Sequence, residues 1–196
     1  EFLALTAVRS GDVRGAVWEE VDEIKAMWAI PPARTKMQRA HVVPLSAAAL
    51  ALLKELPRDN PLVFPAVRGG KLSDATLSAA MKRMHSADLK AGGGGFFDAE
   101  VRSYRKDDDG IMVDVGPAAA TPHGLRSLFR DWCGTNEIPR ELSELALAHR
   151  FGNEVEQAYA RNPLTERRRP IMEAWAAFLA GRDAGVQVIP IREAQQ

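Results

Sequence analysis

A histidine and an arginine stand three positions apart in the stretch TPHGLRSLFRDW, residues 121–132. On a helix, His123 and Arg126 would share one face. Thr121 is a suitable N-cap and Pro122 a suitable first helical residue, so the unpaired N–H groups of the first turn would lie beside the basic pair. This arrangement favours a phosphate or another anion. The alternative is a solvated helix end with two unrelated basic side chains, and the stretch alone leaves both interpretations open.

Other residues that could bind or cleave a phosphodiester are scattered along the chain. Arg9 follows an expected helix end in TAVRSGD, and Lys36 lies in the basic segment RTKMQRA. His149 stands in LALAHRFGN, and Tyr159 follows ten residues later. In chain order the candidate catalytic residues are Arg9, Lys36, His123, Arg126, His149 and Tyr159.

This ordered set resembles the catalytic domain of the tyrosine recombinases, and most closely the integrases of prophages and genomic islands. The family pattern is an arginine, a hairpin lysine, His-x-x-Arg, a histidine or tryptophan, and then a tyrosine. The flanking segments resemble the corresponding family sequences as well; they are TAVRSGDVRGAVWEEVD, HVVPLS and LAHRFGNEVEQAYARNPLTERRR. The resemblance covers the chain except residues 91–120. Two positions depart from it, because Asp12 stands where many members carry glutamate and Ala148 where many carry glycine.

The chemistry of phosphodiester cleavage fits these side chains. Arg9 and Arg126 can each present two N–H groups to phosphate oxygens, on which negative charge develops. His149 would donate one more hydrogen bond. Tyr159 would be the nucleophile, and it needs a cationic pocket or a nearby base because a phenol has a pKa of about 10.

The resemblance implies two proton-transfer roles and a defined product. His123 would accept or support the tyrosine proton, and Lys36 would protonate the departing 5′ oxygen. The product would be a 3′-phosphotyrosine and a free 5′-hydroxyl, and the strands could be rejoined without ATP.

Several assignments compete with simpler ones. Arg34 and Arg39 are close rivals of Lys36 for the hairpin position. Tyr159 could instead pack an amphipathic helix. Tyr104, the other tyrosine, is the weaker candidate for a nucleophile because it sits beside acidic residues and lacks a set of basic partners. Arg167–Arg169 is expected to be a solvated charge run or a contact to the DNA backbone. Residues expected to contact DNA phosphates are Arg34, Arg39 and Arg150.

No metal or cofactor is expected. The four histidines, at positions 41, 85, 123 and 149, lack metal-ligand spacing, and the chain has a single cysteine, Cys133. The acidic run 107–109 precedes a glycine and is typical of a hairpin tip rather than a two-metal site.

Length and composition indicate one soluble domain. The chain has 196 residues, no apolar run of the roughly 20 residues that span a bilayer, and one cysteine, which favours a reducing, cytoplasmic location. Net charge is zero, yet residues 34–90 carry ten Lys/Arg against four Asp/Glu, while residues 91–120 carry three against six. A basic half and an acidic segment therefore permit DNA binding by one face.

The expected elements are mostly helices with a small antiparallel sheet, an α+β domain with the tyrosine recombinase fold. Residues 12–22 have helical spacing, residues 26–30 and 41–45 predict two strands, and Ser46 is expected to cap a helix to about residue 56. A further helix is capped by Ser73 or Asp74. The later helices are expected at 122–135, 139–149, 153–161 and 164–180.

Domain boundaries follow from the same pattern. Residues 1–181 would form the catalytic domain, a fragment of a longer protein, with 91–120 as a β-hairpin insertion. Residues 182–196 would be a tail that docks on a neighbouring protomer.

The expected function is DNA strand cleavage and rejoining by an integrase acting on double-stranded DNA. The resemblance implies a tetramer on synapsed DNA and accessory DNA-bending proteins, with no membrane partner. Two alternatives remain open. One is relaxation of supercoils by a type IB topoisomerase, and the other is a DNA-binding relic without catalysis.

Overall fold

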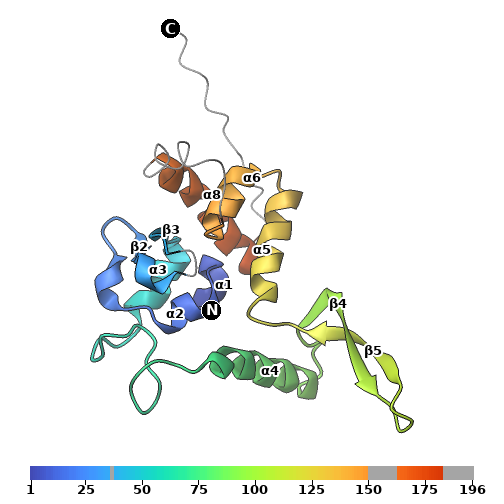
Figure 1. Cartoon of the computed structure of the whole chain (residues 1–196). Helices are drawn as coiled ribbons and strands as arrows, with labels where there is room; N and C mark the ends of the chain where they lie inside the picture. Colours follow the sequence, from blue (N-terminus) through green and yellow to red (C-terminus); the bar gives the residue numbers. More distant parts are fainter. Residues whose placement is uncertain (36–37, 150–162, 183–196) are drawn as a thin grey trace.

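A three-stranded antiparallel sheet organises the N-terminal part of the chain in the computed structural model, which describes residues 1–35, 38–149 and 163–182 (Figure 1). Its strands are β1 (Val21–Asp22), β2 (Met27–Ile30) and β3 (His41–Pro44), in the order β1-β2-β3. Trp28 pairs with Val43 and Ile30 with His41 across β2 and β3. Trp28 and Ile30 are fully buried, because alternate residues of β2 face the same core. The two strands predicted here are confirmed.

Three short helices pack against this sheet and two 3₁₀ turns join its elements. The helices are α1 (Phe2–Thr6), α2 (Ser10–Arg14) and α3 (Ala47–Lys54), and the 3₁₀ turns are η1 (Trp18–Glu20) and η2 (Pro32–Arg34). The Ser46 hydroxyl accepts a hydrogen bond from the Ala49 N–H at 3.3 Å, so the predicted cap of α3 is confirmed.

The predicted helix over 12–22 is wrong beyond Arg14. Gly15 ends α2, and the chain then pairs with a later segment instead of continuing as a helix. The Val63 N–H donates to the Ala16 carbonyl at 2.8 Å, and the Trp18 N–H donates to the Pro61 carbonyl at 3.1 Å. These long-range bonds outweigh the local helical preference of the apolar spacing.

A second core lies between α5 (Gly124–Thr135), α6 (Arg140–Ala146) and α8 (Pro163–Leu179). Phe129, Trp132 and Trp175 form its aromatic centre, with Phe129 and Trp175 edge to face at 5.2 Å. The Trp175 indole N–H donates to the Ala4 carbonyl at 2.7 Å, which ties α8 to the N-terminal helix α1. The two cores therefore meet along α1 and α8.

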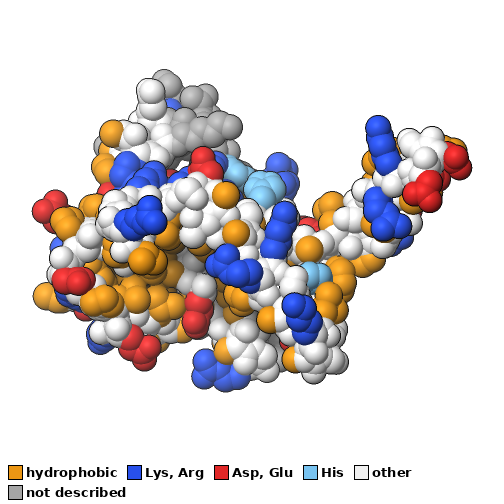
Figure 2. Space-filling view, turned by 90° about the horizontal axis from the view of Figure 1, so that it is seen from below, with side chains coloured by type: hydrophobic (Ala, Val, Ile, Leu, Met, Phe, Trp, Pro, Cys, Tyr) orange, Lys and Arg blue, Asp and Glu red, His pale blue; other side chains and the backbone are white. Residues whose placement is uncertain are grey.

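Helix α4 (Asp74–Lys90) and a hairpin of β4 (Phe97–Lys106) and β5 (Met112–Ala119) form an arm that projects from this body (Figures 1 and 2). The hairpin lies within the segment 91–120. Its tip carries acidic side chains, visible in red in Figure 2, and the Asp107 carboxylate accepts from the Ile111 N–H at 2.8 Å. Gly110 has a φ of 79°, which suits glycine at this turn.

None of the helices in the described ranges combines the length and apolar character needed to cross a bilayer.

Candidate functional site

Arg126 lies where the two halves of the molecule meet, and its guanidinium group is held by two helix ends. It is 6% exposed. Its Nη1 donates to the Ala7 carbonyl at 2.6 Å and its Nη2 to the Leu147 carbonyl at 2.8 Å. Ala7 and Leu147 are the C-cap residues of α1 and α6, whose carbonyls carry the negative end of the helix dipole. Arg126 is therefore oriented by backbone groups rather than by a carboxylate.

The pKa of Arg126 is lowered to about 10, chiefly by burial and also by the charge of Arg9, while the charge of Asp12 acts in the opposite direction. The side chain still carries its charge at neutral pH. A buried guanidinium group beside a second cation stabilises a bound anion, because the anion offsets the repulsion between the two.

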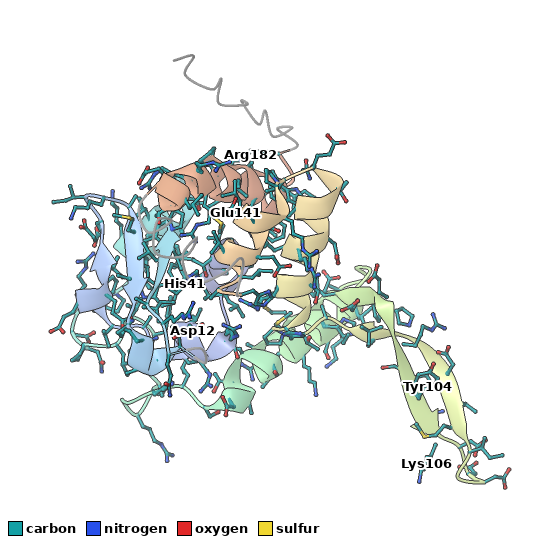
Figure 3. The ribbon with its side chains drawn as sticks, turned by 45° about the horizontal axis from the view of Figure 1, so that its top comes forward. Asp12, His41, Tyr104, Lys106, Glu141 and Arg182 are labelled. Atoms are coloured by element: carbon teal, nitrogen blue, oxygen red, sulfur yellow. The ribbon has the colours of Figure 1, made fainter. Side chains whose placement is uncertain are left out.

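Arg9 comes to this place through a tight turn at the start of α2. The Asp12 carboxylate accepts from the Arg9 backbone N–H at 3.3 Å, and the Asp12 N–H donates to the Arg9 carbonyl at 2.9 Å. Burial raises the pKa of Asp12, opposed by the Arg9 N–H and by the charges of Arg9, Arg34 and Arg126. Figure 3 labels Asp12 and His41, both of which lie in the N-terminal part of the chain.

His149 is positioned by the end of α6. The His149 N–H donates to the Glu144 carbonyl at 2.9 Å and the Ala148 N–H to the Leu145 carbonyl at 3.2 Å, which together form a Schellman motif. Ala148 occupies the left-handed position of this motif, with a φ of 52°. The His149 Nε2 lies 3.4 Å from Arg126 Nη2, and its Nδ1 lies 2.6 Å from Glu144 Oε2.

His123 is exposed at the start of α5, three residues before Arg126. The helix begins at Gly124, two residues later than Pro122, so the prediction of Pro122 as its first residue is wrong. The Thr121 hydroxyl nevertheless accepts from the Gly124 N–H at 3.0 Å and satisfies one donor of the first turn.

Three of the predicted side chains lie outside the described residues, namely Lys36, Arg150 and Tyr159. Arg34 pairs with the Glu20 carboxylate and donates to the Asp12 carbonyl. Arg39 is exposed in the turn between β2 and β3. Figure 3 places Tyr104 far out on the hairpin, away from Asp12 and His41.

Two buried residues near the site were not expected to be there. Arg168, interpreted above as part of a solvated run, is 6% exposed and donates to the Val42 carbonyl at 2.9 Å and to Thr165 Oγ1 at 3.2 Å. Arg167 is exposed, as expected. Burial and the charges of Arg168 and Arg126 lower the pKa of His41 to about 3, so this imidazole is neutral at physiological pH.

The signal for Arg168 is weak in the sequence, because three arginines in a row give no indication of which one points inward. Glu144, in contact with His149, was also missed. Its spacing of five residues from His149 matches neither helix repeat, and only the Schellman motif brings the two together.

The arrangement has the properties of a phosphate site. Arg126 and His149 are in contact, the charge of Arg9 acts on Arg126, and His123 begins the same helix as Arg126. Figure 2 shows histidine side chains beside Lys and Arg side chains on one face. Within residues 1–35, 38–149 and 163–182, no cluster of three or more His, Cys, Asp or Glu could hold a metal ion.

Comparison with known proteins identifies the family of this chain. Residues 1–165 match the Phage integrase family. The chain is 34% identical over 190 residues to the prophage integrase IntA of Escherichia coli K12, covering 94% of this chain and 39% of that protein. It is 30% identical over 192 residues to the integrase of Enterobacteria phage P4, covering 89% of this chain and 38% of that protein. The chain thus spans about two fifths of the length of these relatives.

Two solved structures share the fold. The XerA recombinase aligns with a TM-score of 0.51 and 17% identity, covering 82% of this chain and 54% of that chain. The Tn1549 transposon integrase, solved in complex with circular intermediate DNA, aligns with a TM-score of 0.52 and 8% identity, covering 83% and 57%. The fold is that of a tyrosine recombinase catalytic domain, and the family match over residues 1–165 shows that this chain belongs to the phage integrase family.

Proposed function

We propose that this chain is the catalytic domain of a site-specific DNA recombinase that integrates or excises a mobile element. The observation that supports it most is the junction of Arg126, His149 and Arg9 between α1, α5 and α6. Fixed donors of this kind lower the barrier to phosphoryl transfer by stabilising the charge that develops on the non-bridging oxygens.

In the proposed reaction, Tyr159 attacks the scissile phosphate while Arg9 and Arg126 bind its non-bridging oxygens. His149 donates a further hydrogen bond to the same phosphate. The strand with the 3′-phosphate becomes bonded to the phenolic oxygen, and the other strand leaves with a 5′-hydroxyl.

Two residues would move protons in this reaction. His123 accepts the proton of the tyrosine, and Lys36 gives a proton to the departing 5′ oxygen. Rejoining is the reverse, with a 5′-hydroxyl as nucleophile. Of the two tyrosines, Tyr104 lies on the projecting hairpin, which leaves Tyr159 as the candidate.

The proposed substrate is double-stranded DNA. The Tn1549 integrase was solved bound to circular intermediate DNA, and the relatives named above are integrases. Arg34, Arg39 and Arg150 are proposed to contact DNA phosphates, although Arg34 would have to do so while paired with Glu20. A tetramer on synapsed DNA, with residues 182–196 docked on a neighbour and accessory DNA-bending proteins, completes the proposal.

The test uses a pool of nicked duplexes with randomised sequence around the nick, so that cleavage releases a short fragment and traps the protein on DNA. We expect a covalent adduct with the wild-type chain that is lost in Tyr159→Phe, and sequencing of the trapped DNA should give a defined site. DNA binding without an adduct would instead indicate a non-catalytic relic. Trapping without sequence preference, together with relaxation of any supercoiled plasmid, would indicate a type IB topoisomerase.

A further inference from the structure

Glu144 holds His149 through both its backbone and its side chain. Its carbonyl accepts from the His149 N–H at 2.9 Å, and its Oε2 lies 2.6 Å from the imidazole Nδ1. The residue is 9% exposed, which is unusual for a glutamate without a functional or structural partner.

The two carboxylate oxygens of Glu144 have different neighbours. Oε1 faces the guanidinium groups of Arg130 and Arg140, each at 3.8 Å, and both of these side chains are largely exposed. Oε2 faces the imidazole of His149 and neither of the two guanidinium groups. Since a carboxylate only accepts hydrogen bonds, His149 Nδ1 must carry a proton to make this contact. That proton fixes which nitrogen is left to face the site.

The second ring nitrogen, Nε2, points to Arg126 at 3.4 Å. With no phosphate present, Nε2 can accept a weak bond from Arg126 Nη2. With a phosphate present, the same nitrogen must carry a proton to donate to a phosphate oxygen, and the imidazole then becomes a cation beside the charges of Arg126 and Arg9. The Glu144 carboxylate lies on the opposite side of the ring and offsets this repulsion.

We propose that Glu144 is a positioning residue, which orients the His149 imidazole and stabilises its doubly protonated form while Nε2–H donates to the scissile phosphate. The added proton comes from solvent and returns there when the phosphate leaves. This inference rests on the proposed function, because it assigns to Glu144 a part in the same phosphate site.

The first test compares Glu144→Gln with Glu141→Gln. Glu141 lies in the first turn of the same helix (Figure 3) and is half-buried, and its side chain makes no hydrogen bond or ion pair with the described residues. The probe is a nicked duplex carrying the site selected from the randomised pool. We expect Glu144→Gln to lower the single-turnover cleavage rate about ten- to a hundredfold, as loss of a charge-assisted hydrogen bond predicts. The Kd for DNA and the unfolding midpoint should match those of Glu141→Gln.

The outcomes of this test separate the two proposals. Cleavage by Glu144→Gln at the rate of Glu141→Gln would overturn the role of Glu144 while leaving the proposed function intact. The role of Glu144 would also be overturned if Glu144→Gln lost DNA affinity as much as cleavage rate, or if a lowered unfolding midpoint accounted for the slower cleavage. Either result would show a structural role. Absence of any adduct with the wild-type chain would count against the proposed function itself.

A second test does not depend on cleavage. Nitrogen-15 NMR of labelled histidine in the 196-residue chain reports which ring nitrogen of His149 is protonated. In the neutral imidazole we expect the Nδ1–H form in the wild type and in Glu141→Gln, and a shift toward the Nε2–H form in Glu144→Ala. A wild-type Nε2–H form, or identical spectra for wild type and Glu144→Ala, would contradict the inference.

Discussion

The Arg126 guanidinium group donates a 2.6 Å hydrogen bond to the carbonyl of Ala7, a residue 119 positions earlier in the chain. This bond, with the one to Leu147, makes the orientation of Arg126 depend on the packing of α1 and α6 against α5. The candidate site therefore forms only when both halves of the molecule are assembled.

Replacement of Arg126 by lysine should damage both the site and the fold. One ammonium group cannot reproduce the two-carbonyl contact of the guanidinium fork. We expect adduct formation to fall at least about 100-fold, and the free energy of unfolding to fall by about 1–3 kcal/mol as a buried carbonyl loses its partner. Trapping assays and urea unfolding measure the two effects. Arg167→Lys, at an exposed position of α8, is the control, and an Arg126→Lys variant that cleaves like it would refute the assignment.

Ala148→Gly should stabilise the protein. Ala148 has a φ of 52° at the end of α6, a conformation that costs a residue with a Cβ about 1 kcal/mol relative to glycine. We expect the free energy of unfolding to rise by about 0.5–1 kcal/mol. Ala91→Gly, at the end of α4 where φ is −80°, should bring no such gain. Urea unfolding of both variants checks this, and destabilisation by Ala148→Gly would show that the strain is absent.

The start of α3 and the strands β2 and β3 were predictable because they depend on local signals. Ser46 caps α3, and the strands at 27–30 and 41–44 coincide with apolar runs rich in residues that favour β-structure. The proximity of His123 and Arg126 also follows from their spacing of three.

The remainder depends on contacts distant in sequence. Arg168 is buried because the Val42 carbonyl, 126 residues away, accepts its hydrogen bond. The helical pattern after Arg14 is interrupted because Ala16 pairs with Val63. Glu144 reaches His149 through a backbone turn at Ala148. Glycine usually occupies this position and makes the turn recognisable in a sequence, but here the residue is alanine.

His41 should make the protein less stable in acid. In the unfolded chain its imidazole takes up a proton as the pH falls through about 6.5, whereas in the folded chain its pKa is lowered to about 3. Between these values the unfolded state binds more protons, so the free energy of unfolding falls as the pH falls, by about 1.4 kcal/mol per pH unit.

This contribution is isolated by comparing variants. Urea unfolding between pH 7.5 and pH 4.5 should show a shallower pH dependence for His41→Gln than for the wild type. His123→Gln, which removes an exposed imidazole, is the control for loss of a histidine elsewhere in the chain. Equal slopes for the wild type and His41→Gln would mean that the folded imidazole titrates normally.

Removal of the hairpin should leave the body folded. The Ala120 N–H donates to the Phe96 carbonyl at 2.9 Å, so the two ends of the segment 97–119 lie side by side. Most of its side chains are exposed, including Val101, Tyr104 and Met112. Replacement of 97–119 by a Gly-Ser turn should shift the unfolding midpoint by no more than about 3 °C in calorimetry. Loss of the cooperative transition would show that the hairpin is part of the core.

The central claim is that Tyr159 becomes bonded to DNA at the site formed by Arg9, Arg126 and His149. The most direct measurement is mass spectrometry of the trapped adduct after nuclease and trypsin digestion. We predict a nucleotide attached to the tryptic peptide 151–161, FGNEVEQAYAR, which contains Tyr159. A nucleotide on the peptide 103–105, which contains Tyr104, or on any other residue would contradict the account.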